Sequence, residues 1–361
     1  MNELIIEKQD LLHNINEIRS KVKTEDYTLI AVVKGNAYGL GLIEFTNFLI
    51  ENGFDFFAVA SLDEAIKLRE NNIKEKILLL TPYSKEDEIK FLIENNITLT
   101  IDSKILFDTV ENVCKDLNKK ISVHIKVDTG LSRYGFDYSN VSDIKEIVKN
   151  SNNIIFEGIY SHFSNSLAAD SSFSNIQYNR FINLIEELKK DNIEFKLRHI
   201  CNSSGFFKYE NMHLNAARIG SAFTGNAVGI KSNLKKIGMF HTKITKIKNL
   251  KKGEYVGYAN SYKVKKDMKI GILPTGYYEG VGLSLIEQRH RFLSKAKKTM
   301  IEFKNMFKDS SHTIGEFKAI GQIGMHDVVI DLTNKSYNEN DDVYFYVRPV
   351  LIDTSVKRVY R

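Results

Sequence analysis

The first two-thirds of this 361-residue chain alternates short β-rich runs with amphipathic helical patterns, and this alternation constrains the fold more than any other feature. Regular alternation favours a parallel sheet, and eight repeats favour a closed (β/α)8 barrel over an open doubly wound sheet. No GxGxxG sequence follows the first strand, which counts against a dinucleotide-binding domain. The eight expected strands are Thr28–Lys34, Phe56–Ser61, Lys76–Pro82, Ile97–Ser103, Ile121–Thr129, Ile154–Phe163, Phe195–Ser203 and Asn215–Gly220.

The pattern changes near Lys231, where helical periodicity is nearly lost and short β-like runs alternate with Lys, Gly and Asn turns. We therefore expect two domains, an α/β TIM-type barrel over residues 1–230 and a mostly β domain over residues 231–361. Residues 1–12 are available to pair with the second domain. The β-like runs are Thr242–Lys248, Tyr255–Val256, Lys269–Pro274, Thr299–Phe303, Phe317–Gly321, Val328–Leu332 and Asp342–Tyr346.

Charge and composition argue against several classes of protein. The formal net charge is +6, and no sustained basic face with interleaved aromatic residues is present, so we expect no nucleic-acid partner. No apolar run reaches the roughly 18 residues of a membrane span, and the amino terminus lacks the apolar core of a signal peptide. The two cysteines, Cys114 and Cys201, show no metal-ligand spacing. We expect a cytoplasmic protein without a metal.

The segment AVVKGNAYG, from Ala31 to Gly39, places Lys34 at the carboxyl end of an apolar strand. A lysine in that position loses part of its hydration, which lowers its pKa and makes its amine a potential nucleophile toward carbonyls. The alternative is a lysine that merely extends its ammonium group past the strand end into water.

Further polar residues fall at the carboxyl ends of the other expected strands, where barrel enzymes form their active sites. These residues are Lys126, Asp128, Arg133, His162, Asn202, Ser203 and Arg218. The segments Cys201–Gly205 and Arg218–Ala222 follow the seventh and eighth strands, which is where barrels commonly bind phosphate. The pattern predicts one polar rim with a phosphate site.

Eight collinear segments of the chain resemble the alanine racemase family, whose members are pyridoxal 5'-phosphate (PLP) enzymes with a barrel and a carboxyl-terminal β domain. Each segment alone is weak evidence, but eight in order along nearly the whole chain are specific. They are AVVKGNAYG, IKVDTGLSRYGF (Ile125–Phe136), GIYSHF (Gly158–Phe163), HICNSSG (His199–Gly205), ARIGSAFTG (Ala217–Gly225), VGYANSY (Val256–Tyr262), ILPTGYYEG (Ile272–Gly280) and GQIGM (Gly321–Met325).

The resemblance implies a role for each matching residue. Lys34 would hold PLP as a Schiff base and would act as one catalytic base, with Tyr258 as the second. Arg133 and Met325 would bind the substrate carboxylate, and Lys126 matches a lysine that is carbamylated in some members and orients Arg133. Residues that the resemblance places at the cofactor are Lys34, Tyr38, His162, Asn202, Ser203, Arg218, Gly220 and Ser221.

The chemistry of these residue types agrees with racemisation. A racemase removes the α-proton from one face of the substrate and returns a proton to the other, so it needs two acid/base groups on opposite sides. Arg218 matches the arginine that faces the pyridine nitrogen of PLP. A guanidinium stays protonated and cannot give its proton to that nitrogen, which keeps the ring a weaker electron sink. A carboxylate there would suit a decarboxylase or an aminotransferase.

Three departures from the family pattern concern the substrate end and the phosphate end of the site. His326 stands where the family has an aspartate, Thr354 stands where it has a phosphate-contacting tyrosine, and residues 281–320 are longer than usual and rich in lysine. One methylene changes substrate preference by only about 10–200-fold, so a change of substrate needs few substitutions.

We therefore expect a PLP-dependent racemase that acts on alanine as a head-to-tail homodimer, in which Tyr258 reaches the partner's barrel. Racemisation of serine, lysine or ornithine is the first alternative. A non-catalytic PLP carrier and a barrel-type amino-acid decarboxylase are the others. The β domain with its second base argues against the carrier, and Arg218 argues against the decarboxylase.

Overall fold

The computed structural model describes residues 2–168, 170–225, 232–283 and 313–361. The chain divides into two units, Gln9–Lys236 and a second unit that combines Met1–Lys8 with Ile237–Arg361. The expected boundary between residues 230 and 231, the expected strand Thr299–Phe303 and most of segment 281–320 lie outside the described residues. In the described part of the chain, no helix is both long enough and apolar enough to cross a membrane.

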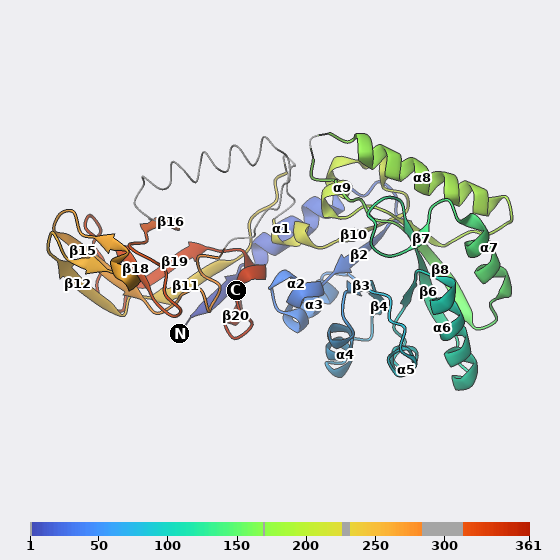
Figure 1. The fold of residues 1–361 in the computed structure, drawn as a ribbon, viewed down its shortest axis with the longest axis horizontal. Helices are drawn as coiled ribbons and strands as arrows, with labels where there is room; N and C mark the ends of the chain where they lie inside the picture. Colours follow the sequence, from blue (N-terminus) through green and yellow to red (C-terminus); the bar gives the residue numbers. More distant parts are fainter. Residues whose placement is uncertain (1, 169, 226–231, 284–312) are drawn as a thin grey trace. The chain divides into compact units, whose positions relative to one another are not determined.

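Eight parallel strands of the larger unit form a nearly closed barrel, which confirms the predicted fold class (Figure 1). The strand order is β4-β3-β2-β10-β9-β8-β6-β5, and a bridge from Leu78 to Thr98 joins the two outer strands. The strands are β2 (Thr28–Val32), β3 (Phe56–Val59), β4 (Lys76–Leu79), β5 (Leu99–Ile101), β6 (Ile121–Asp128), β8 (Ile154–Tyr160), β9 (Leu197–His199) and β10 (Ala216–Ile219), and the short β7 (Phe136–Asp137) pairs with β6.

Helices follow the barrel strands and surround them (Figure 1). They form because apolar residues recur at helical spacing, as with Leu106, Val110 and Cys114 of α6, which are buried. Serine caps begin two of them, since the Ser61 and Ser103 hydroxyls accept backbone N–H groups three residues later. The helices are α1 (Lys8–Arg19), α2 (Lys34–Tyr38), α3 (Leu42–Glu51), α4 (Leu62–Glu70), α5 (Glu86–Glu94), α6 (Lys104–Leu117), α7 (Val141–Asn150), α8 (Ser172–Lys189) and α9 (Ser203–Lys208), with 3-10 turns η1 (Glu210–Met212) and η2 (Ser221–Thr224).

The second unit is built mainly from β-strands. Its four-stranded sheet has the order β19-β11-β1-β20, so the amino-terminal strand β1 (Glu3–Ile6) lies between two strands from the other end of the sequence. A three-stranded sheet has the order β12-β15-β18. The remaining elements are β11 (Met239–Lys243), β12 (Lys246–Leu250), β13 (Tyr255–Val256), β14 (Tyr262–Lys263), β15 (Met268–Leu273), β16 (Thr313–Ile314), β17 (Phe317–Lys318), β18 (Val328–Asp331), β19 (Asp342–Tyr346) and β20 (Lys357–Tyr360), with 3-10 turns η3 (Tyr258–Asn260) and η4 (Pro349–Leu351).

Two aromatic residues on neighbouring strands pack together in the core of the second unit. Phe345 on β19 is 3% exposed and stacks on Phe240 of β11, with ring centroids 5.2 Å apart. We predict that Phe345→Ala lowers the free energy of unfolding by about 3–5 kcal/mol in urea denaturation, because it leaves a cavity in a packed core. Tyr346→Ala on the same strand is the control. Tyr346 is 59% exposed, and its replacement should cost about 0.5 kcal/mol or less. Equal losses for both would contradict the assigned core.

Candidate active site

Lys34 lies two residues after the end of strand β2 and precedes a turn of left-handed backbone. Gly35, Asn36, Ala37 and Tyr38 all have φ values between 53° and 65°. Non-glycine residues pay roughly 1–2 kcal/mol each for this conformation, so it persists only where surrounding contacts hold it. Hydrogen bonds from Ala37 N to the Val33 carbonyl (2.7 Å) and from Gly39 N to the Gly35 carbonyl (3.0 Å) close the turn.

A carboxylate that the sequence analysis did not single out also holds this turn. Glu64 Oε1 accepts the Gly35 N–H at 2.5 Å, and Oε2 accepts the Ala60 N–H at 3.0 Å. The same side chain completes a capping box with Ser61 at the start of α4. The Ser-x-x-Glu sequence signalled the helix cap, but the contact with the residue after Lys34 depends on strand neighbours. Glu64 thereby fixes the backbone that carries the candidate nucleophile.

The surroundings of Lys34 favour its neutral amine. Burial lowers the pKa of Lys34, the positive charges of Arg133 and Arg218 lower it further, and Glu64 opposes them. A lowered pKa leaves more of the amine unprotonated at neutral pH, and only the unprotonated amine attacks a carbonyl. The structure therefore gives Lys34 the electrostatic setting that its strand-end position predicted.

Small residues from three segments meet beside this turn. The Ser203 hydroxyl accepts the N–H groups of Gly220 (3.0 Å) and Ala222 (3.2 Å). A Cβ atom on Gly220 would lie 2.5 Å from the Tyr38 hydroxyl oxygen, so only glycine leaves room for that side chain. Ser221 comes next, at the start of η2. Hydroxyls and backbone amides gathered in this way are suited to binding a phosphate group.

Arg218 on β10 is the cation at the centre of the barrel rim and is 3% exposed. Its guanidinium donates to His162 Nδ1 (2.9 Å), His199 Nδ1 (2.5 Å) and the Ser161 carbonyl (2.8 Å). It also lies over the ring of Tyr160, 4.9 Å from the centroid. Burial lowers the pKa of Arg218 to about 10, which still leaves it charged at neutral pH.

The two histidines that contact Arg218 are electrically neutral. Burial and the positive charge of Arg218 hold the pKa values of His162 and His199 well below the ordinary histidine range. A neutral imidazole can accept a hydrogen bond, whereas a protonated one cannot. The sequence analysis predicted His162 at the site but gave His199 no role. The Asn202 amide nitrogen lies 3.5 Å from His162 Nε2, and the Asn202 side-chain oxygen accepts the Gly205 N–H.

The end of β6 supplies a second buried amine and a shaped turn. Lys126 lies over the Tyr160 ring, 4.8 Å from its centroid, and burial together with Arg218 holds its pKa well below the usual value. Asp128 accepts the N–H groups of Gly130 (2.8 Å) and Arg133 (3.1 Å). Asp128 therefore shapes the turn that presents the exposed Arg133 side chain, rather than acting as a free carboxylate.

Tyr258 and Met325 belong to the second unit, and both are surface residues there. Tyr258 is 73% exposed at the start of η3 and Met325 is 49% exposed. His326 contacts the Glu279 carboxylate at 2.7 Å and packs against the Tyr278 ring. Thr354, the residue at the departure near the carboxyl terminus, is exposed.

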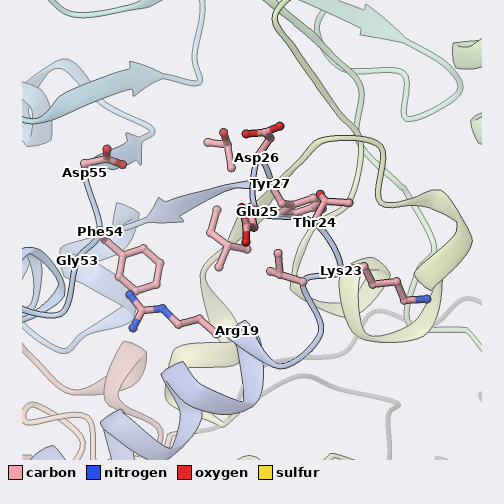
Figure 2. Close-up of a pocket in the computed structure, with 12 residues that line it drawn as sticks. Arg19, Lys23, Thr24, Glu25, Asp26, Tyr27, Gly53, Phe54 and Asp55 are labelled. Atoms are coloured by element: carbon pink, nitrogen blue, oxygen red, sulfur yellow. The ribbon is translucent and has the colours of Figure 1, made fainter.

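Figure 2 shows a cavity of about 660 Å³. It is lined by residues before and at the starts of β2 and β3, including Tyr27, Thr28 and Phe54. Reactive side chains of a barrel gather at the carboxyl ends of the strands, so this cavity is separate from the Lys34 site.

The rim residues fit PLP. Lys34 offers an amine with a lowered pKa for the aldehyde, and the Tyr38–Ser203–Gly220 cluster offers donors for the phosphate. Arg218 offers a fixed cation that can only donate hydrogen bonds. A barrel with this combination of residues belongs to the class of barrel-type PLP enzymes.

Comparison with known families agrees with that class. Residues 6–228 match the model of the family "Alanine racemase, N-terminal domain", and residues 237–356 match "Alanine racemase, C-terminal domain". The chain belongs to the alanine racemase family. The resemblance found in the sequence is thereby confirmed, and the protein is a PLP-dependent isomerase.

Individual proteins show the same relationship. The alanine racemase of Methanococcus maripaludis is 34% identical over 282 residues, which cover 76% of this chain and 75% of the relative. Two solved structures share the fold. Alanine racemase from Clostridium difficile has a TM-score of 0.85 at 24% identity and covers 100% of this chain and 95% of its own. Histidine racemase from Leuconostoc mesenteroides has a TM-score of 0.83 at 19% identity, with coverages of 100% and 98%.

The lowered pKa of Lys34 leads to a prediction about pH. Capture of PLP by the cofactor-free protein requires the unprotonated amine, so its rate should rise with pH and level off below the ordinary lysine pKa of about 10.5. Arg133→Ala removes a positive charge that lowers the pKa of Lys34. We expect the midpoint of the rate profile to move to higher pH, as measured by stopped-flow absorbance.

The control for this measurement is Arg198→Ala, which removes an exposed arginine from β9. It should leave the midpoint in place. A midpoint that stays fixed or falls in Arg133→Ala would contradict the electrostatic coupling between Arg133 and Lys34.

Proposed function

We propose that this protein interconverts L- and D-alanine, with Lys34 as one base and Tyr258 as the other. The observation that carries the proposal is the setting of Lys34, a strand-end amine with a lowered pKa beside a phosphate cradle and a buried guanidinium. The name of the Methanococcus maripaludis relative, alanine racemase, supports alanine as the substrate.

The proposed mechanism assigns a separate task to each residue. PLP, when bound, supplies an electron-withdrawing ring that makes the α-hydrogen of an amino acid acidic. The Lys34 amine takes or returns the α-proton on one face, and the Tyr258 hydroxyl does so on the other. Arg133 binds the substrate carboxylate with its planar guanidinium. Tyr38, Asn202, Ser203, Gly220 and Ser221 hold the phosphate end.

Arg218 limits how strongly the ring withdraws electrons. It would offer only N–H donors to the ring nitrogen, and its pKa of about 10 keeps it protonated at neutral pH. The His162 and His199 acceptors keep its donors aligned. Proton return then competes well with side reactions such as transamination. Lys126, as a carbamate, would carry a negative charge that aligns Arg133.

The proposal includes a head-to-tail homodimer in the cytoplasm. Tyr258 is exposed on the β-rich unit, and we assign it to the barrel of the partner subunit. We propose a barrel domain over residues 1–230, whose first strand β1 pairs with the second domain, and a β domain over residues 231–361.

A second candidate is racemisation of a larger amino acid, such as serine, lysine or ornithine. The observation that favours it is the His326–Glu279 pair beside Met325, which replaces the aspartate expected in the family. The histidine racemase from Leuconostoc mesenteroides supports the idea that this fold serves other side chains.

The first test is a substrate panel. We expect the PLP-loaded protein to convert L-alanine to D-alanine faster than any other amino acid, as measured by chiral chromatography. Lys34→Ala should abolish both the conversion and the visible absorbance of lysine-bound PLP. Conversion dominated by serine, lysine, ornithine or histidine would favour the second candidate. No conversion by the PLP-loaded protein would refute the racemase proposal.

The second test separates the two bases. Loss of one acid/base group costs about 10²–10⁴-fold in rate, so we expect Tyr258→Phe to slow racemisation by at least about 100-fold. Exchange of the α-proton with deuterium should persist for one enantiomer, because Lys34 still serves that face. NMR in D2O would measure this exchange.

Tyr255→Phe is the matched control, since Tyr255 is a neighbouring tyrosine that is 50% exposed. It should racemise at the wild-type rate. Equal loss of exchange for both enantiomers in Tyr258→Phe, with PLP still bound, would contradict the assignment of a separate base to each face.

A further inference from the structure

Three buried polar side chains and one partly buried carboxylate form a row across the interior of the barrel, and we call this row the histidine relay. It consists of Glu157 on β8, His124 on β6, His199 on β9 and Arg218 on β10. His124 Nδ1 lies 2.9 Å from His199 Nε2, and His199 Nδ1 lies 2.5 Å from the Arg218 guanidinium. Both histidines are 0% exposed. The relay joins the catalytic rim to a carboxylate deeper in the barrel.

The far end of the relay is a pair of atoms that face one another. His124 Nε2 and Glu157 Oε2 are 3.9 Å apart. Each is buried and makes no hydrogen bond to another described atom. Unpaired buried polar atoms are costly, so a donor and an acceptor this close are natural partners. The other oxygen of Glu157 forms an ion pair with Lys76 of β4.

The direction of every hydrogen bond in the relay follows from Arg218. A guanidinium has donors only, so His199 Nδ1 must accept and the proton of His199 must lie on Nε2. His199 Nε2 therefore donates to His124 Nδ1, and the proton of His124 must lie on its own Nε2. That nitrogen lies 3.9 Å from Glu157 Oε2, which is an acceptor when ionised. One set of proton positions thus makes both hydrogen bonds between Arg218 and His124 and leaves the last N–H beside a carboxylate.

The barrel interior is shaped around the central imidazole of the relay. A Cβ atom on Gly158 would lie 2.6 Å from His124 Nδ1, so the absence of a side chain there leaves room for the ring. The Phe56 ring meets His124 edge-on at 5.9 Å, and Tyr160 stacks on His199 with ring planes 5° apart. The rings have little freedom to turn, which makes the relay a fixed connection.

Charge also favours a role for Glu157. Among the described residues, no carboxylate forms an ion pair with Arg218, although Arg218 is a buried cation. Burying a charge without an opposite charge is unfavourable. The contact with His124, together with Lys76, lowers the pKa of Glu157 to about 2, so it is ionised. The Glu157 carboxylate and the Arg218 guanidinium thus lie at opposite ends of the relay. Burial lowers the pKa values of His124 and His199, so two neutral imidazoles lie between these charges.

We propose that Glu157 is a positioning residue for the active site, which reinforces the proton positions that Arg218 favours on His124 and His199 and thereby holds the orientation of the Arg218 guanidinium. This inference deepens the proposed function and rests on it for the task of Arg218. Without a carboxylate at residue 157, the His124 N–H loses the negative charge that lies 3.9 Å from it. Only Arg218 then favours the direction in which His199 accepts, so the guanidinium and the two imidazoles are held less firmly.

The competing explanation is that Glu157 serves only as half of an ion pair with Lys76 and contributes to stability. Under that explanation, removing its charge would weaken folding and leave the imidazole protons of His124 and His199 unchanged. The two explanations therefore differ in a spectroscopic signal and in kcat, not only in stability.

The experiment compares Glu157→Gln, which keeps an acceptor, with Glu157→Leu, which keeps none. In metalloproteins, loss of a side chain that orients a metal-binding histidine typically lowers metal affinity or activity by about 10–100-fold. By analogy, we expect Glu157→Leu to lower kcat by about 10-fold with a smaller change in KM. Glu157→Gln should recover most of this loss. Glu111→Gln is the matched control, because Glu111 is a partly buried carboxylate that accepts the Asn152 and Asn153 N–H groups outside the relay.

Imidazole ¹⁵N NMR of the PLP-loaded protein provides a readout that does not depend on activity. We expect His124 and His199 to carry their protons on Nε2 in the wild-type protein, with a shifted His124 signal in Glu157→Leu and unchanged signals in Glu111→Gln. A proton on Nδ1 of His199 in the wild-type protein would overturn the relay.

The kinetic outcome can also overturn the inference. If Glu157→Leu folds normally and keeps wild-type kcat, Glu157 does not position Arg218. A wild-type protein that racemises no amino acid but shows the expected imidazole protons would refute the proposed function while leaving the relay intact, so the two failures are distinguishable.

Discussion

The candidate active site depends on one buried guanidinium that can only donate hydrogen bonds. Arg218 obliges its two histidine neighbours to accept. Burial lowers the pKa values of those histidines and of Lys34 and Lys126, and the charge of Arg218 lowers them further. A neutral or accepting side chain in the same place would remove both effects. The charge and the donors of this one residue therefore add to burial in favouring neutral imidazoles and amines around it.

Backbone strain at the site is stabilised by the barrel around it. The left-handed turn after Lys34 is unfavourable for Asn36, Ala37 and Tyr38, yet Glu64 from the following βα unit accepts the first N–H group of the turn. The same turn brings Tyr38 against Gly220. The conformation of residues 35–38 therefore positions both Lys34 and the Tyr38 side chain at the phosphate cradle. Contacts with the surrounding barrel hold this strained segment in place.

The sequence predicted the barrel because β-α alternation is a local pattern that survives without knowledge of neighbours. It also placed the rim side chains at strand ends. Expected strand Thr28–Lys34 ends earlier, at Val32, because Val33 already caps the turn α2, whose left-handed residues begin with Gly35. Glu64, His124 and His199 gained no predicted role. Their contacts join elements that the barrel brings together from distant parts of the chain, and neither periodicity nor composition predicts such contacts.

The position of strand β1 has a consequence for how this polypeptide is made. β1 is synthesised before the barrel, yet its sheet partners β11 and β20 follow the barrel, and β20 lies at the carboxyl terminus. During synthesis, residues Glu3–Ile6 must wait unpaired while the whole barrel leaves the ribosome. Long-range pairing of this kind is slow and exposes an apolar strand to aggregation. The barrel sequence thus separates β1 from its partners, and this sheet can be completed only after residues Lys357–Tyr360 have been made.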